Sequence, residues 1–134
     1  IYSQLLDAKS RSQNHFRRKM NNIYYTKLFK KLKIKNVRLL KVEDPNFQNF
    51  MDYPVLVKNK EDLNIYLLTR GIETKQIFYQ DCANIFIKKN FKSIRENSKY
   101  FTNSIIGLPN HPNVSKKYME LISNEIKNFY EIRS

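Results

Sequence analysis

Two cationic side chains and one phenol flank a glycine in the middle of this chain. Arg70 precedes Gly71 directly, and Lys75 and Tyr79 follow it. Because glycine has no Cβ, Gly71 can adopt the left-handed conformation that often ends a helix. We expect a helix over residues 60–70, a tight corner at Gly71 and a strand over 73–79, so that rigid backbone positions the polar groups. Arg and Lys can then form charge-assisted hydrogen bonds to anionic oxygens, and the phenol can donate to a hydroxyl group.

A second interpretation of these residues stays open, in which Arg70 and Lys75 are solvated and Tyr79 belongs to the core. Other kinds of chemistry have little support in the sequence. One cysteine and two histidines, far apart in the chain, offer none of the ligand pairs that zinc sites use. The lone Cys82 is more typical of a small buried residue than of a nucleophile. With only two glycines there is no glycine-rich phosphate loop, and the sequence predicts no self-sufficient active site.

Composition limits the class of protein. A chain of 134 residues is enough for one domain with one core. The formal charge of +13 favours a polyanionic partner, although Lys, Asn and Ile are abundant throughout and the charge also fits a general bias toward Lys. The single cysteine suits a reducing cytoplasm, and no apolar run approaches the roughly 20 residues that span a bilayer. Because the chain starts at Ile1 without a signal sequence, we expect a piece of a longer protein.

The order of predicted elements indicates an α+β domain with a small mixed or antiparallel sheet flanked by helices. One long helix covers residues 3–33, because apolar residues keep helical spacing without Pro or Gly. Strands are expected over 37–42, 51–57, 73–79 and 104–107, and Pro54 favours an edge or the start of a strand. Helices are expected over 60–70, beginning at Asn59, and over 116–130, capped by Ser115. The apolar stripe of the long helix should exceed what one small sheet can cover: Phe16, Met20, Ile23 and Leu28.

Three motifs, in this order, resemble one family. They are Arg70–Thr74, the aromatic stretch Ile77–Tyr79, and Leu108–Ser115 with its sequence LPNHPNVS. The set is similar to the C-terminal small domain of DegT/DnrJ/StrS-type aminotransferases, which use pyridoxal phosphate to aminate keto-sugars linked to a nucleotide. The resemblance covers nearly the whole chain. It implies that residues 1–33 are the helix that leaves a cofactor domain absent from this chain, and that 34–134 form the small domain.

The resemblance also implies a function. The parent protein would be a cytoplasmic, homodimeric aminotransferase that binds pyridoxal phosphate, a nucleotide-sugar and an amino donor, without membrane or nucleic acid. This chain would border the substrate cleft but be inactive alone, because the lysine that binds the cofactor belongs to the other domain. Arg70 and Lys75 would bind the diphosphate, Tyr79 the sugar or nucleotide, and His111, between Pro109 and Pro112, is a further substrate-binding candidate.

One departure from the family pattern concerns the residues after the aromatic strand. Relatives often have Pro and then His there, whereas this chain has Gln80, Asp81 and Cys82. A contact that His makes with substrate would then be lost or supplied from elsewhere. The alternative function is a basic interaction module, with the long helix as its contact element, that binds nucleic acid or an acidic protein surface.

Overall fold

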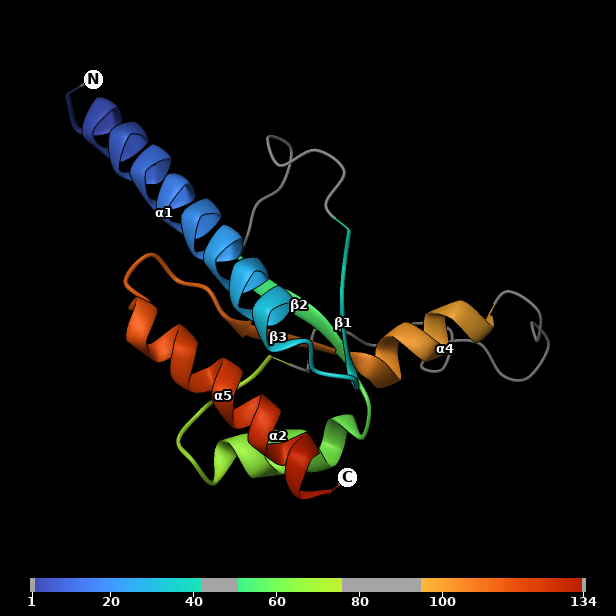
Figure 1. Cartoon of the computed structure of the whole chain (residues 1–134). Helices are drawn as coiled ribbons and strands as arrows, with labels where there is room; N and C mark the ends of the chain where they lie inside the picture. Colours follow the sequence, from blue (N-terminus) through green and yellow to red (C-terminus); the bar gives the residue numbers. More distant parts are fainter. Residues whose placement is uncertain (1, 42–50, 76–94, 134) are drawn as a thin grey trace.

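The computed structural model describes residues 2–41, 51–75 and 95–133 of the chain. Within this part, the helices are α1 (Tyr2–Leu32), α2 (Lys60–Leu68), α4 (Arg95–Ser104) and α5 (Lys116–Ile132), and the strands are β1 (Val37–Leu39), β2 (Asp52–Val57) and β3 (Ile105–Pro109). The predicted α+β class is confirmed, and the sheet is antiparallel in the order β1-β2-β3 (Figure 1). No helix in these ranges is long and apolar enough to cross a membrane.

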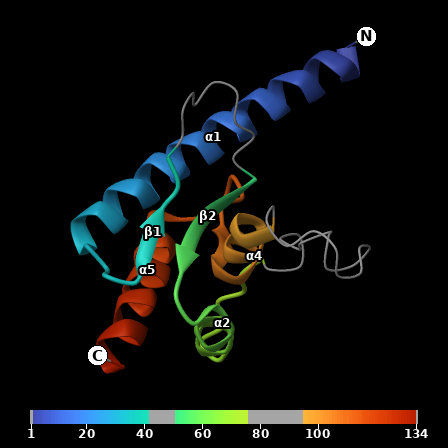
Figure 2. The same ribbon diagram turned by 90° about the vertical axis from the view of Figure 1, so that its right-hand side faces the viewer.

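The core lies between the sheet and three helices, α1, α2 and α5. Alternate residues of β2 and β3 point toward these helices, as the register places Tyr53 opposite Leu108 and Val55 opposite Ile106. The predicted buried stripe of α5 is confirmed, since Met119, Ile122, Ile126 and Phe129 are all buried. In Figure 2, α1 and α4 lie on opposite sides of β2.

The last third of α1 is attached to β2 through aromatic rings. Tyr25 and Phe29, one turn apart, are both buried and stack on Tyr53, with ring centroids 4.8 Å and 6.0 Å away. Thr26 lies between them, and its hydroxyl is 3.0 Å from the hydroxyl of Tyr53. This contact fixes the direction in which α1 leaves the sheet.

Toward its start, α1 leaves the core. Phe16, Met20 and Ile23 are exposed by 62%, 47% and 40%, whereas Leu28 is half-buried against the core. The predicted excess of apolar surface is therefore confirmed for three of the four residues. Exposed side chains of this size on one helix are typical of a surface that meets another molecule or domain.

Pro54 lies near the start of β2, the central strand of the sheet, so of its two predicted places, an edge strand or the start of a strand, the edge strand is wrong. The local geometry explains why proline is tolerated. Gly107 is opposite Pro54, but its hydrogen bonds go to Lys75 on its other side. The N–H of Gly107 donates to the carbonyl of Lys75 at 3.0 Å, and the carbonyl of Gly107 accepts from the N–H of Lys75 at 2.9 Å. On the β1 side the ladder ends at Leu39, opposite Val55, so Pro54 faces no partner there. Its missing N–H group therefore costs no ladder hydrogen bond.

The corner at Gly71 forms as predicted. Gly71 has a φ of +71°, and its N–H donates to the carbonyl of Leu68 at 2.9 Å, just after α2 ends. Of the strand expected over 73–79, Lys75 pairs with Gly107 as an isolated bridge, and residues 76–79 lie outside the described residues.

Two predictions about helix starts differ in outcome. Ser115 caps α5, and its Oγ accepts a hydrogen bond from the Tyr118 N–H at 3.1 Å. Asn59 precedes α2 as predicted, but with a left-handed backbone, φ 50°, and no hydrogen bond from its side chain to the helix. The strand predicted over 37–42 ends at Leu39, and the helix predicted over 60–70 ends at Leu68.

Candidate functional site

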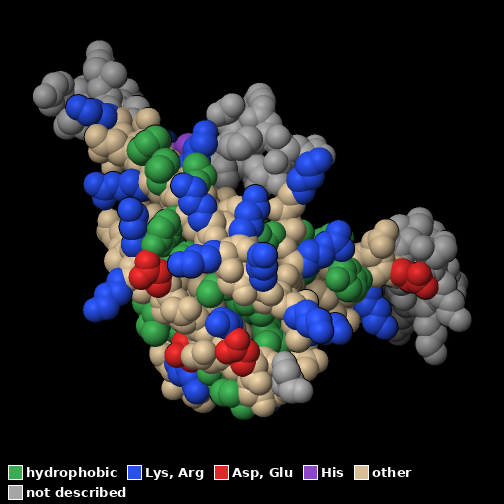
Figure 3. Space-filling view, viewed as in Figure 1, with side chains coloured by type: hydrophobic (Ala, Val, Ile, Leu, Met, Phe, Trp, Pro, Cys, Tyr) green, Lys and Arg blue, Asp and Glu red, His purple; other side chains and the backbone are tan. Residues whose placement is uncertain are grey.

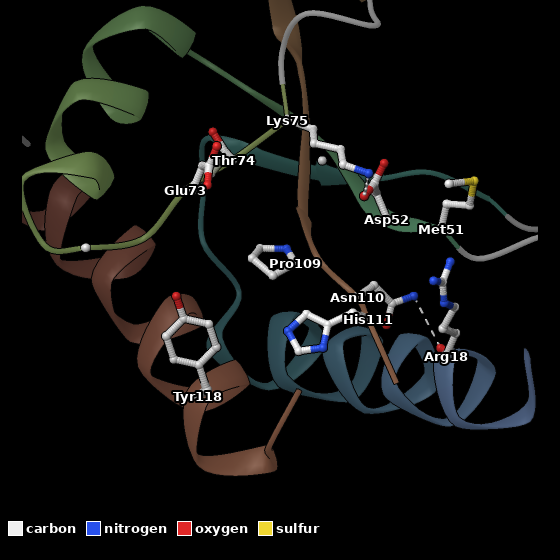
Figure 4. A pocket seen from close by; sticks show the side chains of 12 residues that line it. Arg18, Met51, Asp52, Glu73, Thr74, Lys75, Pro109, Asn110, His111 and Tyr118 are labelled. Atoms are coloured by element: carbon white, nitrogen blue, oxygen red, sulfur yellow. Dashed lines mark hydrogen bonds and ion pairs between the residues drawn. The ribbon is translucent and has the colours of Figure 1, made fainter. Parts of the chain in front are cut away.

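A pocket of about 460 Å³ opens where the Gly71 corner, the end of β3 and the middle of α1 come together (Figure 4). We call it the His111 pocket. Its polar lining includes Arg18 from α1, Asp52 from β2, Lys75 after the corner, and His111 after β3. Two predicted site residues, Lys75 and His111, are thus brought together from positions 36 residues apart in the sequence.

The backbone that carries His111 is held by α1 at three places. The hydroxyl of Tyr25 donates to the carbonyl of Pro109 at 3.0 Å, and Asn21 donates from Nδ2 to the carbonyl of His111 at 3.2 Å. In the other direction, Asn110 donates from Nδ2 to the carbonyl of Arg18 at 3.3 Å. Burial raises the pKa of the Tyr25 phenol, so it remains a donor well above neutral pH. The position of His111 is therefore set by α1 as well as by its own loop.

Lys75 is fixed at both its backbone and its side chain. Its N–H and C=O pair with Gly107, and its Nζ lies 2.9 Å from Oδ1 of Asp52. The lysine side chain is 45% exposed and the aspartate 17%, so the ammonium borders the opening while its carboxylate partner lies deeper. This is a cation held in place at the rim of the pocket.

The lining of the His111 pocket contains as many acidic side chains as Lys and Arg side chains. Arg18 and Lys75 are opposed by Asp52 and Glu73, with His111 and the phenol of Tyr118 as further polar groups. In Figure 4 the His111 ring lies between Tyr118 and the Lys75–Asp52 pair. Such a lining suits a ligand that carries both negative charge and hydroxyl groups, because donors and acceptors are both present.

Arg70, the third described candidate, lies elsewhere. Its Nε is 2.7 Å from Oε2 of Glu125 on α5, and its guanidinium covers the ring of Tyr66 at 3.5 Å from the centroid. Tyr66 also donates to Glu125 at 3.0 Å, and its pKa is raised, first by burial and then by this carboxylate. Arg70 lines a different pocket, with Glu125 and Glu131. Its ion pair with Glu125 joins the corner after α2 to α5, and Arg70 does not line the His111 pocket. Tyr79 lies outside the described residues.

Arg18, Asp52 and Asn110 were not singled out from the sequence. A signal for Arg18 exists, because it lies seven residues before Tyr25 and so on the same face of α1 as that buried ring. Asp52 starts β2 next to an alternating strand pattern, but only the pairing of β2 with β3 brings it near Lys75. No local sequence rule predicts that contact.

Two lysines are already engaged by protein groups. The ammonium of Lys75 is paired with the carboxylate of Asp52. Burial lowers the pKa of Lys60, but its Nζ donates to the carbonyl of Thr102 at 2.7 Å and lines neither pocket described so far. The described residues also hold no cluster of His, Cys, Asp or Glu that could bind a metal.

No family model and no curated sequence matches this chain, so its likeness to known proteins is one of structure. An aminotransferase named TlmJ from Streptoalloteichus hindustanus superposes with a TM-score of 0.81, at 14% identity, over 96% of this chain and 35% of that chain. A DegT DnrJ EryC1 StrS aminotransferase from Brucella abortus gives a TM-score of 0.69 at 18% identity, over 87% and 31%. The Helicobacter pylori aminotransferase PseC, involved in the biosynthesis of pseudoaminic acid, gives 0.67 at 22% identity, over 98% and 36%.

The similar structures include the sugar aminotransferase CalS13 from Micromonospora echinospora and a GDP-4-keto-6-deoxymannose-3-dehydratase with a trapped PLP-glutamate geminal diamine. The chain spans about a third of the length of these proteins. At these identities the likeness establishes the fold, which is that of one part of DegT/DnrJ/EryC1/StrS-type sugar aminotransferases.

Proposed function

We propose that this chain is the small domain of a pyridoxal-phosphate-dependent aminotransferase that acts on nucleotide-linked keto-sugars. The observation that carries the proposal is the structural match, which covers nearly all of this chain and about a third of each similar enzyme. Residues 1–33 would lead from a cofactor domain, and 34–134 would form the domain that borders the substrate. Pyridoxal phosphate would be held by the cofactor domain and supply the electron sink for amino transfer.

The His111 pocket supports a substrate-binding role for this domain. A nucleotide-sugar carries a diphosphate and several hydroxyl groups, and the pocket offers two cations, two carboxylates, an imidazole and a phenol. Lys75 and Arg18 would bind the diphosphate, and Asp52 or Glu73 would accept from sugar hydroxyls. His111 would donate to the ligand from its braced loop, and Tyr79 is a further candidate. Arg70 is the weakest of the candidates, because Glu125 and Tyr66 already engage it.

The exposed stripe of α1 supports the assignment of residues 1–33. Phe16, Met20 and Ile23 lie beyond the small domain's own core, where a second domain would cover them. In the whole enzyme this contact would join the two domains, and the assembly would be a cytoplasmic homodimer. A size measurement of the full-length protein tests the dimer directly.

Substitution of Lys75 in the full-length enzyme tests the substrate role. Lys75→Ala should raise KM for the nucleotide-sugar about tenfold, about 1.4 kcal/mol, with little change in kcat, because the lost contact is made equally in the bound and transition states. Tyr79→Phe should raise KM less. The matched control is Lys31→Ala, an exposed lysine of α1 outside the pocket, which should leave KM unchanged.

Two outcomes would contradict parts of this proposal. Wild-type KM in both the Lys75 and Tyr79 variants would place the substrate elsewhere. The chain by itself should give no lysine adduct with pyridoxal phosphate after borohydride reduction, and a stoichiometric adduct at one lysine would mean that this domain holds the cofactor.

A further inference from the structure

A second pocket, of about 350 Å³, lies on the β1 edge of the sheet, between the start of β1 and the junction of α4 with β3. We call it the Lys58 pocket. Three cations line it: Lys35 just before β1, Arg38 within β1, and Lys58 just after β2. All three residues are exposed. Figure 3 shows Lys and Arg side chains gathered around the position of β1 and along the near part of α4.

The other polar groups that line the Lys58 pocket can all donate hydrogen bonds. They are the side-chain amides of Asn36, Asn59 and Asn103, the hydroxyl of Ser104 and the phenol of Tyr100. Among its described lining residues there is no Asp or Glu, in contrast to the His111 pocket, where two acids oppose two cations. A lining of donors and cations without a carboxylate favours an anion that carries several acceptor oxygens.

The walls of the Lys58 pocket are fixed by hydrogen bonds from buried or paired groups. The N–H of Lys58 donates to the carbonyl of Asn36 at 3.2 Å, and the hydroxyl of Tyr130 donates to the carbonyl of Lys58 at 2.5 Å. On the opposite wall, the buried Lys60 donates to the carbonyl of Thr102 at 2.7 Å and so ties the start of α2 to the end of α4. The cations are therefore presented by backbone that is already in place before a ligand binds.

One side of the Lys58 pocket is aromatic. Tyr100 on α4 is 50% exposed and meets Phe101 edge to face, with ring centroids 5.9 Å apart. Leu56 and Val57 of β2, both buried, also line the pocket. An exposed ring beside a cationic pocket can stack on a planar group of the same ligand.

We infer that the Lys58 pocket binds a small phosphorylated ligand with a planar ring, of the nucleoside diphosphate class. Its phosphate oxygens contact Lys35, Arg38 and Lys58, and its ring lies against Tyr100. The volume of about 350 Å³ suits a ligand of this size. The inference does not depend on the proposed function, because the Lys58 and His111 pockets share no lining residue.

The test is a titration of the 15N-labelled chain with inorganic pyrophosphate and, separately, with UDP, followed through backbone amide shifts. Both probes should shift Asn36, Lys58, Asn59 and Asn103. Arg38→Gln and Lys58→Gln should each weaken pyrophosphate binding about tenfold, as expected for loss of a charge-assisted hydrogen bond. Tyr100→Leu should weaken UDP binding about fivefold and leave pyrophosphate unchanged. Lys31→Gln is the control, since it removes the same charge outside the pocket.

Three outcomes of these titrations would overturn the inference. An equal loss in Lys31→Gln would mean that net charge alone attracts the probe. Shifts confined to Gly71, Lys75 and His111 would assign the ligand to the other pocket and would bear only on the proposed function. A short single-stranded oligonucleotide that binds more tightly than UDP, and equally well in Arg38→Gln, would mean a nucleic-acid surface instead.

Discussion

The His111 pocket and the Lys58 pocket are of similar size but differ in charge. In the first, Lys75 is paired with Asp52, and the lining also includes Arg18 and a second acid, Glu73. In the second, three cations face the opening without an acid among the described lining residues. A balanced pocket selects a ligand that can satisfy both signs of charge, whereas an unbalanced one attracts any compact anion. The net charge of +13 is therefore distributed unevenly between these two pockets.

The largest expected effect comes from making the first pocket resemble the second. Asp52→Asn removes one negative charge and the partner of the Lys75 ammonium while keeping the size of the side chain. Pyrophosphate binding at the His111 pocket should tighten about tenfold, because an anion no longer competes with a carboxylate for Lys75. Amide shifts of Lys75 and His111 during titration measure this affinity.

Asp62→Asn is the matched control for that substitution. Asp62 also forms an ion pair, with Arg133 at 2.6 Å, but on the surface outside both pockets. It should leave pyrophosphate affinity unchanged. Equal affinities in the wild type and in Asp52→Asn would mean that the Lys75–Asp52 pair does not limit anion binding.

A smaller effect is expected from loosening the wall of the His111 pocket. Tyr25→Phe keeps the ring stack and removes the donor to the carbonyl of Pro109, which should cost about 1 kcal/mol of unfolding free energy. Urea denaturation measures the change. Phe29→Leu, which alters the same stack without touching Pro109, separates lost packing from the lost hydrogen bond, since only Tyr25→Phe should shift the His111 amide.

The same tyrosine predicts a dependence of stability on pH. Burial raises the pKa of Tyr25 and raises that of Tyr130 to about 12, above the value near 10 of an unfolded tyrosine. The folded state therefore holds these protons more tightly, and its stability is full below pH 10 and falls as the pH rises toward 12. Tyr25→Phe should make this fall shallower, and an unchanged slope would exclude Tyr25 as its source.

The smallest effect is expected at the wall of the Lys58 pocket. Lys60→Met keeps the buried stem but removes the ammonium, so relief of its desolvation offsets the lost bond to Thr102, and stability should change by less than about 1 kcal/mol. Burial lowers the pKa of Lys60 below its ordinary value of 10.5. The native lysine therefore contributes stability above pH 10.5 that is lost as the pH falls through its folded pKa. The variant should not show this dependence of stability on pH. Pyrophosphate affinity at the Lys58 pocket should fall a fewfold, and an unchanged affinity would mean that the Lys60–Thr102 bond does not shape the pocket.

The sequence predicts the elements of this fold better than it predicts the pockets. Gly71 and Ser115 act through their own backbone and first neighbours, so local rules are sufficient for them. The rule about proline favours an edge or the start of a strand for Pro54, because it does not include how far the neighbouring strand extends. The salt bridge of Lys75 with Asp52 and that of Arg70 with Glu125 depend on pairing between distant segments, which residue type and spacing do not contain.

The exposed first part of α1 has a consequence for cooperativity. Its backbone hydrogen bonds are local, and a short isolated helix is only marginally stable in water. Phe16 and Met20 are exposed, whereas Arg18 and Asn21 on the same stretch still contact the loop that carries His111. Amide hydrogen exchange should therefore quicken from Tyr25 toward the start of α1, in steps of a turn. Any molecule that covers Phe16, Met20 and Ile23 would slow that exchange. The protection factors of these amides would therefore show whether a partner is bound to this face of α1.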